Sequence, residues 1–342
     1  MKKIIGILTL CLCALLVACS DDNPVVDSLQ VVSTDGIDFS AASGEGTITV
    51  SAAGAIAAAS NKDWCKVTVE GSLVRVSVDE SVEVTSRVAL VTISSGGNNV
   101  QVPVVQAGAI ALMNMYDLYF SCGYEGGQFS YDFQTNTSYN IEVPEEAAGW
   151  LSYTYDTANN QLVFEVAPSS DKAPRGTEVK ITAGAKEVVL SISQIEIALD
   201  DIAGIWNMSY INASDELLSG ETQIGMLPGV GMVLLEFMNL YFPLEMQDNG
   251  VLAILPGVSV GQMQGYDLKT TVSIEGGYFS ATIPCVAVPK VKDGQLIYRF
   301  GYCSSYTGGA NVMYPMIYAF SGNTAVGYLE QYVDLEISRP LN

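Results

Sequence analysis

The sequence predicts an all-β protein: two tandem immunoglobulin-like β-sandwiches followed by an antiparallel β-barrel or sandwich domain. Three observations predict this fold class. Helical periodicity is nearly absent beyond the N-terminal segment. Short alternating runs of apolar and polar residues, bounded by glycine, asparagine and aspartate, recur along the chain, as is typical of β-strands. Two stretches of about 80 residues also repeat the same order of features, which indicates tandem domains.

The two stretches correspond feature by feature. Each begins with a glycine-rich segment, Gly44-Glu45-Gly46 or Glu125-Gly126-Gly127, followed by an alternating strand and a tryptophan, Trp64 or Trp150. Each then has an arginine before a strand and a glutamine at the end of the last strand, at the same separation in both copies: Arg87 and Gln106, Arg175 and Gln194. We expect the arginines to be structural, capping a strand or pairing with a loop carboxylate.

This pattern suits an immunoglobulin-like sandwich in each copy, over residues 30–108 and 114–197. The features together resemble the BACON domain family, whose name stands for Bacteroidetes-associated carbohydrate-binding. The resemblance covers about half of the chain. It implies β-sandwiches and an association with glycans, or a spacer role that holds a distal domain away from a membrane.

The N-terminus has the pattern of an export signal over residues 1–18. Lys2 and Lys3 precede an uncharged apolar run, Ile4 to Val17, that is too short to span a bilayer. The run ends in Leu16-Val17-Ala18-Cys19, which resembles the lipobox of bacterial lipoproteins. That resemblance implies that Cys19 is acylated and anchors the chain in outer-membrane lipid, with residues 19–29 as a tether.

An acidic stretch, Asp21-Asp22, directly follows this cysteine and resembles the surface-export signal of Bacteroidetes lipoproteins. We therefore expect an outer-membrane lipoprotein of the cell envelope that is exposed on the surface.

The composition excludes several function classes. With 37 acidic and 15 basic residues the formal charge is −22, which disfavours binding to nucleic acid. There is no histidine, so Ser-His-Asp and Cys-His catalysis and the common histidine-containing zinc sites are absent. The cysteines show no CxxC spacing. Acidic pairs such as Glu145-Glu146 are sequence neighbours, and neighbours on a strand would point to opposite faces, so none of them indicates a glycosidase pair. We expect no metal, no cofactor and no enzymatic activity.

The cysteines also suggest one disulfide. Cys285 and Cys303 flank a predicted turn at Lys292-Asp293-Gly294, so they could face each other on adjacent strands, either as a disulfide or unpaired. Cys65 and Cys122 lie in different repeats, and we expect both to be free or buried.

A third domain is predicted over residues 198–342. Its opening, Gly204-x-Trp206, resembles the first strand of lipocalin-like, or calycin, barrels. Turn sequences that favour hairpins follow at Asp248-Asn249-Gly250, Glu275-Gly276-Gly277 and Lys292-Asp293-Gly294.

Aromatic residues are concentrated in this third domain. Tyrosine combines a flat apolar ring with a polar hydroxyl, which suits pockets for sugars, although many of these rings could instead fill a core. We select as ligand-binding candidates Tyr302, Tyr306, Tyr314 and Tyr318.

A second candidate surface lies in the second repeat, where Trp150, Tyr153 and Tyr155 are accessory binding candidates. The two tyrosines share one strand face. A tryptophan in a small sandwich more often fills the core.

The leading hypothesis is a surface lipoprotein that binds glycan or another small ligand, with the two repeats as a stalk or as accessory modules. One alternative is a structural envelope lipoprotein whose partner is another envelope protein. A hydrolase that uses carboxylates is a further alternative.

Overall fold

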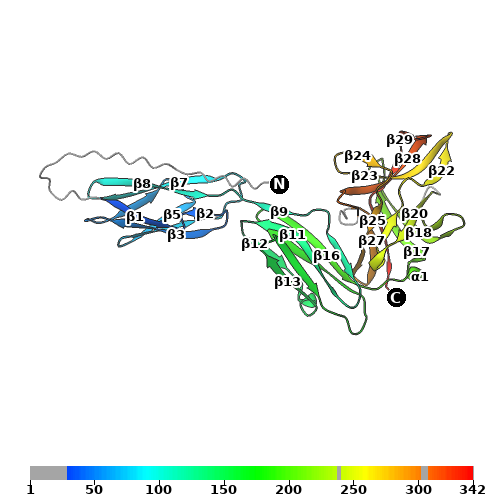
Figure 1. Ribbon diagram of the computed structural model, residues 1–342, viewed down its shortest axis with the longest axis horizontal. Helices are drawn as coiled ribbons and strands as arrows, with labels where there is room; N and C mark the ends of the chain where they lie inside the picture. Colours follow the sequence, from blue (N-terminus) through cyan, green and yellow to red (C-terminus); the bar gives the residue numbers. More distant parts are fainter. Residues whose placement is uncertain (1–28, 237–239, 302–306, 342) are drawn as a thin grey trace. The chain divides into compact units, whose positions relative to one another are not determined.

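The computed structural model describes residues 29–236, 240–301 and 307–341. Nearly all regular structure in these ranges is β-strand, which confirms the predicted all-β class (Figure 1). Besides the strands, these ranges contain a short α-helix, α1 (Leu199–Ile202), and the 3-10 turns η1 (Glu145–Ala147) and η2 (Asp248–Gly250). None of their helices is long and apolar enough to cross a membrane.

The first sandwich contains eight strands. They are β1 (Gln30–Asp35), β2 (Asp38–Phe39), β3 (Gly44–Ser51), β4 (Ala57–Ser60), β5 (Cys65–Glu70), β6 (Leu73–Val78), β7 (Arg87–Ser95) and β8 (Asn98–Gln106). They form two four-stranded sheets, ordered β1-β3-β6-β5 and β2-β8-β7-β4. The first two strands thus lie in different sheets, and the chain crosses between the sheets after β1.

The second sandwich repeats this topology. Its strands are β9 (Ala111–Met113), β10 (Tyr119–Cys122), β11 (Gly127–Thr135), β12 (Tyr139–Glu142), β13 (Leu151–Asp156), β14 (Gln161–Val166), β15 (Arg175–Ala183) and β16 (Lys186–Gln194). The sheets are ordered β13-β14-β11-β9 and β10-β16-β15-β12. When β9 to β16 are matched in order with β1 to β8, the strand neighbours are identical in the two sandwiches.

Apolar and polar side chains alternate along the strands, and the apolar ones form the core of each sandwich. In β6, Val74 and Val76 are fully buried, whereas Arg75 between them is exposed and pairs with Glu70. Side chains at every second position reach the same face of a sheet, so the valines meet the opposite sheet. Burial of each such side chain contributes roughly 1.5 to 3 kcal/mol to the free energy of unfolding.

The repeated arginine and glutamine bind each other in both sandwiches. Arg87 Nε donates to Gln106 Oε1 at 2.8 Å, and Arg175 Nε donates to Gln194 Oε1 at 2.7 Å. Both glutamines are fully buried. The structural role expected for the arginines is therefore correct, but the side-chain oxygen that each Nε binds belongs to the glutamine of the last strand and not to a loop carboxylate.

The glutamine amides also bind backbone carbonyls. Gln106 Nε2 donates to the carbonyls of Ala41 and Ala42, and Gln194 Nε2 donates to those of Gly123 and Tyr124. These carbonyls belong to the connection between the second and third strands of each sandwich. We name this arrangement, with Arg87 or Arg175, the Arg-Gln clamp.

The last domain contains two further sheets. Its strands are β17 (Gly204–Ile211), β18 (Leu217–Leu227), β19 (Gly231–Leu235), β20 (Tyr241–Met246), β21 (Leu252–Ile254), β22 (Ser259–Met263), β23 (Tyr266–Ile274), β24 (Tyr278–Ser280), β25 (Cys285–Ala287), β26 (Pro289–Lys292), β27 (Gln295–Arg299), β28 (Val312–Ser321), β29 (Thr324–Gln331) and β30 (Val333–Pro340). A nine-stranded barrel-like sheet is ordered β25-β21-β20-β19-β18-β17-β30-β27-β26. A five-stranded sheet is ordered β22-β23-β28-β29, with β24 paired to β23.

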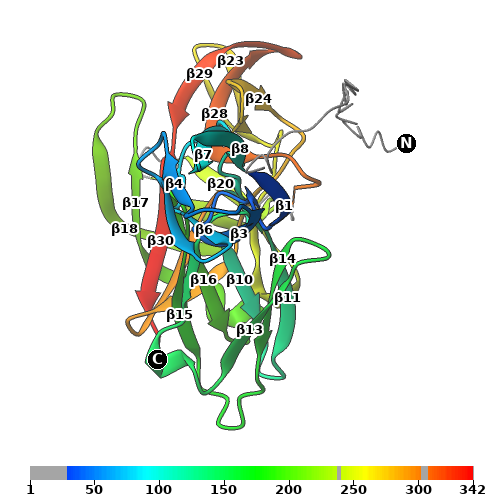
Figure 2. The same ribbon diagram turned by 90° about the vertical axis from the view of Figure 1, so that its left-hand side faces the viewer.

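The barrel-like sheet joins the first and last strands of the domain. β17 pairs with β30 on one side and with β18 on the other, and Figure 2 labels all three strands. Trp206 on β17 is buried, its Nε1 donates to the Ile202 carbonyl at 2.9 Å, and the Arg339 guanidinium lies 4.4 Å from its ring centroid. The predicted turn at Lys292-Asp293-Gly294 connects β26 to β27, as expected for a hairpin.

From Gln106 onward the chain forms one compact unit, in which β26 packs against the second sandwich. Val291 N donates to Ser193 Oγ at 2.9 Å. Lys290 Nζ and Lys292 Nζ bind the two carboxylate oxygens of Glu178 at 2.7 and 2.8 Å. The approach is so close that a Cβ atom on Gly176 would lie 2.0 Å from the Val291 carbonyl oxygen.

This close contact generates a first prediction. Gly176→Ala should lower the free energy of unfolding by about 1 to 3 kcal/mol, because the added methyl group forces β26 away from β15. Urea denaturation measures the change. Gly327→Ala is the matched control, since no atom lies within 4 Å of its added Cβ. Equal stability of the two variants would contradict the proposed steric contact.

The pH dependence of Glu178 gives a second prediction. Burial raises the pKa of this carboxyl, but the hydrogen bonds from Lys290 and Lys292 outweigh burial and leave the pKa lowered. A lowered folded-state pKa contributes stability above the unfolded-state value of about 4.3, and this contribution is lost as the pH falls through the folded-state pKa.

Glu178→Gln should therefore destabilise the protein near neutral pH by roughly 1 kcal/mol at most, because 34% of the Glu178 side chain is exposed and solvent screens the pair. The difference from the wild type should shrink below about pH 4. Urea denaturation between pH 3 and pH 7 checks both statements, and a difference that does not depend on pH would argue against an ion pair.

Candidate functional site

Two of the four tyrosines predicted to bind ligand lie on one strand. Tyr314 and Tyr318 are part of β28, whereas Tyr302 and Tyr306 lie outside the described residues. Both described side chains are partly buried. The strand belongs to the five-stranded sheet, which lies at one end of the last domain in Figures 1 and 2.

Strand register places further aromatic side chains on the face that carries these tyrosines. Tyr318 is opposite Lys269 of β23 on one side and opposite Tyr328 of β29 on the other. Tyr314 is opposite Ser273, which in turn is opposite Phe279 of β24. Directly opposed residues point to the same side of a sheet, so these side chains share one face.

Three rings on this face lie close to the Tyr318 ring, and Tyr314 lies farther along the same strand. The Phe279 and Tyr318 rings are stacked, with centroids 4.3 Å apart and an interplanar angle of 15°. Tyr318 also lies 6.1 Å from Tyr328 and 6.3 Å from Phe320, measured between ring centroids. We name this set the aromatic face: Phe279, Tyr314, Tyr318, Phe320 and Tyr328.

Solvent reaches the aromatic face. Phe279 is 40% exposed and Tyr328 is 52% exposed, whereas Phe320 is buried. Large aromatic side chains normally gain stability from burial, and exposed aromatic side chains that lie close together mark an interaction site. Phe279 and Tyr328, on either side of Tyr318, therefore offer flat apolar area to a ligand.

Charged groups lie at the edge of the aromatic face. Lys269 Nζ is 5.2 Å from the Phe320 ring centroid and 3.5 Å from Asp267 Oδ2. Ser259 Oγ donates a hydrogen bond to Asp267 Oδ1. A donor and an acceptor beside exposed rings are the polar groups that fix the orientation of a sugar in a binding site.

Other aromatic residues of the last domain fill its core. Tyr298 and Phe300 are fully buried, and Tyr298 Oη donates to the Gly250 carbonyl at 2.8 Å. Burial raises the pKa of Tyr298, which therefore stays protonated at neutral pH. Some aromatic residues of the last domain thus form its core, whereas others, such as Phe279 and Tyr328, are exposed on the aromatic face.

The accessory candidates of the second repeat lie against its core. Tyr153 and Tyr155 are opposite Phe164 and Leu162, which are both fully buried, so the face that they share is directed toward the core. Tyr155 contacts Phe133, and 39% of Tyr153 is exposed. Trp150 packs at the edge of this core, with the Arg175 guanidinium 4.7 Å from its ring.

The sequence alone selects Tyr314 and Tyr318 of this site but not the other aromatic members, Phe279, Phe320 and Tyr328. It selects neither Lys269 nor Asp267, because neither residue belongs to a motif. The register between β23, β28 and β29 brings them to Tyr318. Because this register depends on long-range pairing and on bulges in β28, no local pattern could have identified them.

The three cysteines in the described part of the chain are buried and lie outside the aromatic face. Cys65 and Cys122 are free and buried, as expected, and burial raises the pKa of both thiols. Cys285 is buried in β25, and its predicted disulfide partner, Cys303, lies outside the described residues. Across the described ranges, no three cysteine, aspartate or glutamate side chains are grouped so that they could hold a metal ion.

The fold defines a multidomain all-β protein with two immunoglobulin-like sandwiches and a barrel-like last domain. Two segments match the model of the BACON family, described as "Putative binding domain, N-terminal": residues 54–107 and 138–194. Each segment covers the later strands of one sandwich. The chain therefore contains two BACON domains, which confirms this part of the resemblance.

Among curated proteins, no relative matches the chain. A three-immunoglobulin-domain structure of titin domains I67-I69, an E-to-A mutated variant, aligns at 9% identity with a TM-score of 0.29, covering 80% of this chain and 93% of that structure. An endo-fucoidan hydrolase of glycoside hydrolase family 107 aligns at 12% identity with a TM-score of 0.26, covering 52% of this chain. The alignment spans only 30% of that hydrolase.

Proposed function

We propose that this protein is a surface-exposed lipoprotein of the cell envelope that binds glycan on the aromatic face of its last domain. The observation that carries the proposal is the pair of exposed rings, Phe279 and Tyr328, in contact with Tyr318, with Lys269 and Asp267 beside them. The apolar faces of sugar rings stack on such side chains, and sugar hydroxyls bind the neighbouring polar groups. In this proposal the BACON domains act as a stalk or as accessory modules.

The third prediction tests the aromatic face directly. Tyr328→Ala should weaken glycan binding by roughly 1 to 3 kcal/mol, because it removes an exposed stacking surface. Since Tyr328 is half exposed, the fold should tolerate the change. Isothermal titration of the full chain against a panel of soluble polysaccharides measures the affinity, and a thermal melt reports on the fold.

A matched control tests whether the loss of binding comes from this face or from removal of any exposed tyrosine. Tyr278 is also exposed, but it is opposite Ile274 of β23, and alternation places it on the other side of the sheet from Phe279. Tyr278→Ala should bind as the wild type does. If Tyr328→Ala retained full affinity for every polysaccharide bound by the wild type, or if both variants lost it equally, the aromatic face would not be the binding site.

The fourth prediction concerns the anchor. Cys19→Ala should abolish incorporation of a fatty-acid label, because the Cys19 thiol is the group that is acylated in the proposed lipoprotein. It should also abolish removal of the signal peptide after residue 18. Metabolic labelling in a bacterial host that acylates lipoproteins measures this, followed by separation of membrane and soluble fractions. A variant that still carries the label would place the acyl chain elsewhere.

A further inference from the structure

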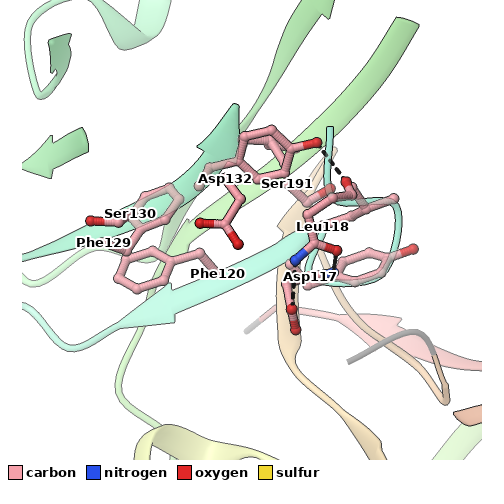
Figure 3. A pocket seen from close by; sticks show the side chains of 11 residues that line it. Asp117, Leu118, Phe120, Phe129, Ser130, Asp132 and Ser191 are labelled. Carbon is pink, nitrogen blue, oxygen red and sulfur yellow. Dashed lines mark hydrogen bonds between the residues drawn. The ribbon is translucent and has the colours of Figure 1, made fainter. Parts of the chain in front are cut away.

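A cavity of about 320 Å³ opens in the second sandwich, away from the aromatic face. It lies between β10 and β11 and under the connection from β9 to β10 (Figure 3). β9 pairs with β11 only over residues 133–135, so in the described part of the chain no strand pairs with residues 129–131 on that side. The volume is at the lower end of the range of ligand pockets, which suits one small molecule.

In the first sandwich, the corresponding crossing lies against the strand. Gly44 and Gly127 begin the matched strands β3 and β11, so Gly46 corresponds to Phe129. A Cβ atom on Gly46 would lie 2.3 Å from the carbonyl oxygen of Gly36, which belongs to the crossing from β1 to β2. No side chain larger than that of glycine fits at this position of the first sandwich.

In the second sandwich, the cavity separates the crossing from β11. Residues 114–118 connect β9 to β10, whereas residues 36–37 connect β1 to β2. Asp117 and Leu118 of the longer crossing line the cavity on one side, and Phe129 lines it on another. Two sequence differences between the copies therefore accompany this space: a longer crossing, and a phenylalanine in place of a glycine.

Hydrogen bonds hold the crossing over the cavity. Asn114 Oδ1 accepts from the backbone N–H groups of Tyr116 and Asp117 at 2.9 and 3.3 Å, and its Nδ2 donates to Asp117 Oδ2 at 2.8 Å. Tyr131 Oη donates to the Asn114 carbonyl at 2.5 Å, and burial raises the pKa of Tyr131, so its hydroxyl stays protonated as the donor. A rim that is ordered before binding reduces the entropy lost when a ligand enters.

One wall of the cavity is a stack of aromatic rings. The Phe120 and Phe129 rings have centroids 3.7 Å apart and an interplanar angle of 18°, and Phe129 stacks in turn on Phe164 at 5.0 Å and 10°. Phe164 is fully buried in the core, whereas Phe120 and Phe129 are partly exposed. The core thus supports a rigid aromatic wall, and aromatic rings gain more from contact with one another than their buried area alone provides.

Most polar side chains of the lining already bind other groups of the protein. Asn114, Asp117 and Tyr131 form the hydrogen bonds of the crossing. Leu118 and Leu190 add apolar surface to the lining. A ligand with many hydroxyl groups would lose hydrogen bonds to water that this lining does not replace, so a ligand with few polar atoms fits it better.

Asp132 has acceptor capacity left for a ligand. Its Oδ1 accepts from Gln161 Nε2 at 3.1 Å, which uses only part of the capacity of a carboxylate. Figure 3 shows Asp132 between the phenylalanine pair and the segment that contains Asp117 and Leu118. The Asp132 side chain is exposed, so it lies at the mouth of the cavity, where it can accept from a donor at one end of a ligand.

We propose that this cavity binds a planar aromatic molecule of one or two fused rings that carries a single hydrogen-bond donor, such as a phenol or a naphthol. The ring packs against Phe120 and Phe129 inside the cavity, and the donor binds the Asp132 carboxylate at its mouth. Pockets for small molecules commonly combine an apolar lining with a few polar groups that fix the orientation of the ligand. The cavity is separate from the aromatic face, and the proposal does not depend on glycan binding.

The test uses the full chain and three matched probes. 2-Naphthol, followed by its fluorescence at pH 7, should bind saturably. Decahydro-2-naphthol has the same carbon skeleton and hydroxyl group but no aromatic ring, so as a competitor it should bind about tenfold more weakly. 2-Methoxynaphthalene keeps the rings but has no donor, and it should also bind about tenfold more weakly than 2-naphthol.

Two variants locate the probe in the cavity. Phe120→Leu replaces the outer ring of the stack by an aliphatic side chain and should weaken 2-naphthol binding about tenfold. Asp132→Asn replaces the charged acceptor by a neutral one and should weaken it about tenfold. Glu165→Gln removes an exposed carboxylate on β14 and is the matched control, which should leave the affinity unchanged.

Thermal melts show whether each variant is folded, and Asp132→Asn tests the site even if Phe120→Leu is unstable, because it changes an exposed side chain. The proposal is overturned if 2-naphthol does not bind saturably, or if decahydro-2-naphthol binds as tightly as 2-naphthol. Full affinity for 2-naphthol in a folded Asp132→Asn variant would also contradict it.

A further variant separates the cavity from the aromatic face. Tyr328→Ala should leave the affinity for 2-naphthol unchanged, because Tyr328 belongs to the last domain and not to the lining of the cavity. Loss of 2-naphthol binding in Tyr328→Ala would assign the probe to the aromatic face and overturn the cavity assignment.

Discussion

The two sandwiches depend on one buried polar interaction, the Arg-Gln clamp. A buried amide without partners is costly, yet Gln106 and Gln194 are fully buried because an arginine binds the side-chain oxygen and backbone carbonyls accept from the nitrogen. These carbonyls lie where the chain passes from the second strand in one sheet to the third strand in the other. The clamp therefore ties the end of the last strand to this passage in both copies.

The clamp fixes this end of each sandwich. The two sandwiches differ instead in the crossing from the first strand to the second strand. In the first copy the crossing is short and lies directly on Gly46, so the two sheets close over it. In the second copy a longer crossing, held by Asn114 and Tyr131, leaves a space walled by Phe129. The same topology thus leaves a space beside this crossing in the second sandwich, whereas the crossing of the first sandwich lies against Gly46. The difference lies in a few residues outside the shared motif.

In the last domain, the residues that form the core are different from the exposed rings proposed to bind ligand. Its barrel-like sheet buries Trp206 and Tyr298 and packs through β26 on the second sandwich, where Gly176 admits the Val291 carbonyl. The five-stranded sheet contributes Leu268 and Val272 to the same core and carries exposed rings on its other face. Thr271, Met316 and Phe320 on that other face are buried as well, so only the exposed rings there, Phe279 and Tyr328, are free of a packing role.

The sequence by itself determined the all-β class, the two repeats, the structural role of their arginines and the turn at Asp293, because alternation, glycine positions and turn chemistry are local properties. It also placed Tyr318 among the candidates for binding. It could not determine that Arg175 binds Gln194, that Phe279 stacks on Tyr318, or that Tyr153 faces a core, because each depends on strand register and sheet order. Only the tertiary structure decided these contacts and opened the cavity beside Phe129, since a cavity depends on the path of backbone segments that are distant in sequence.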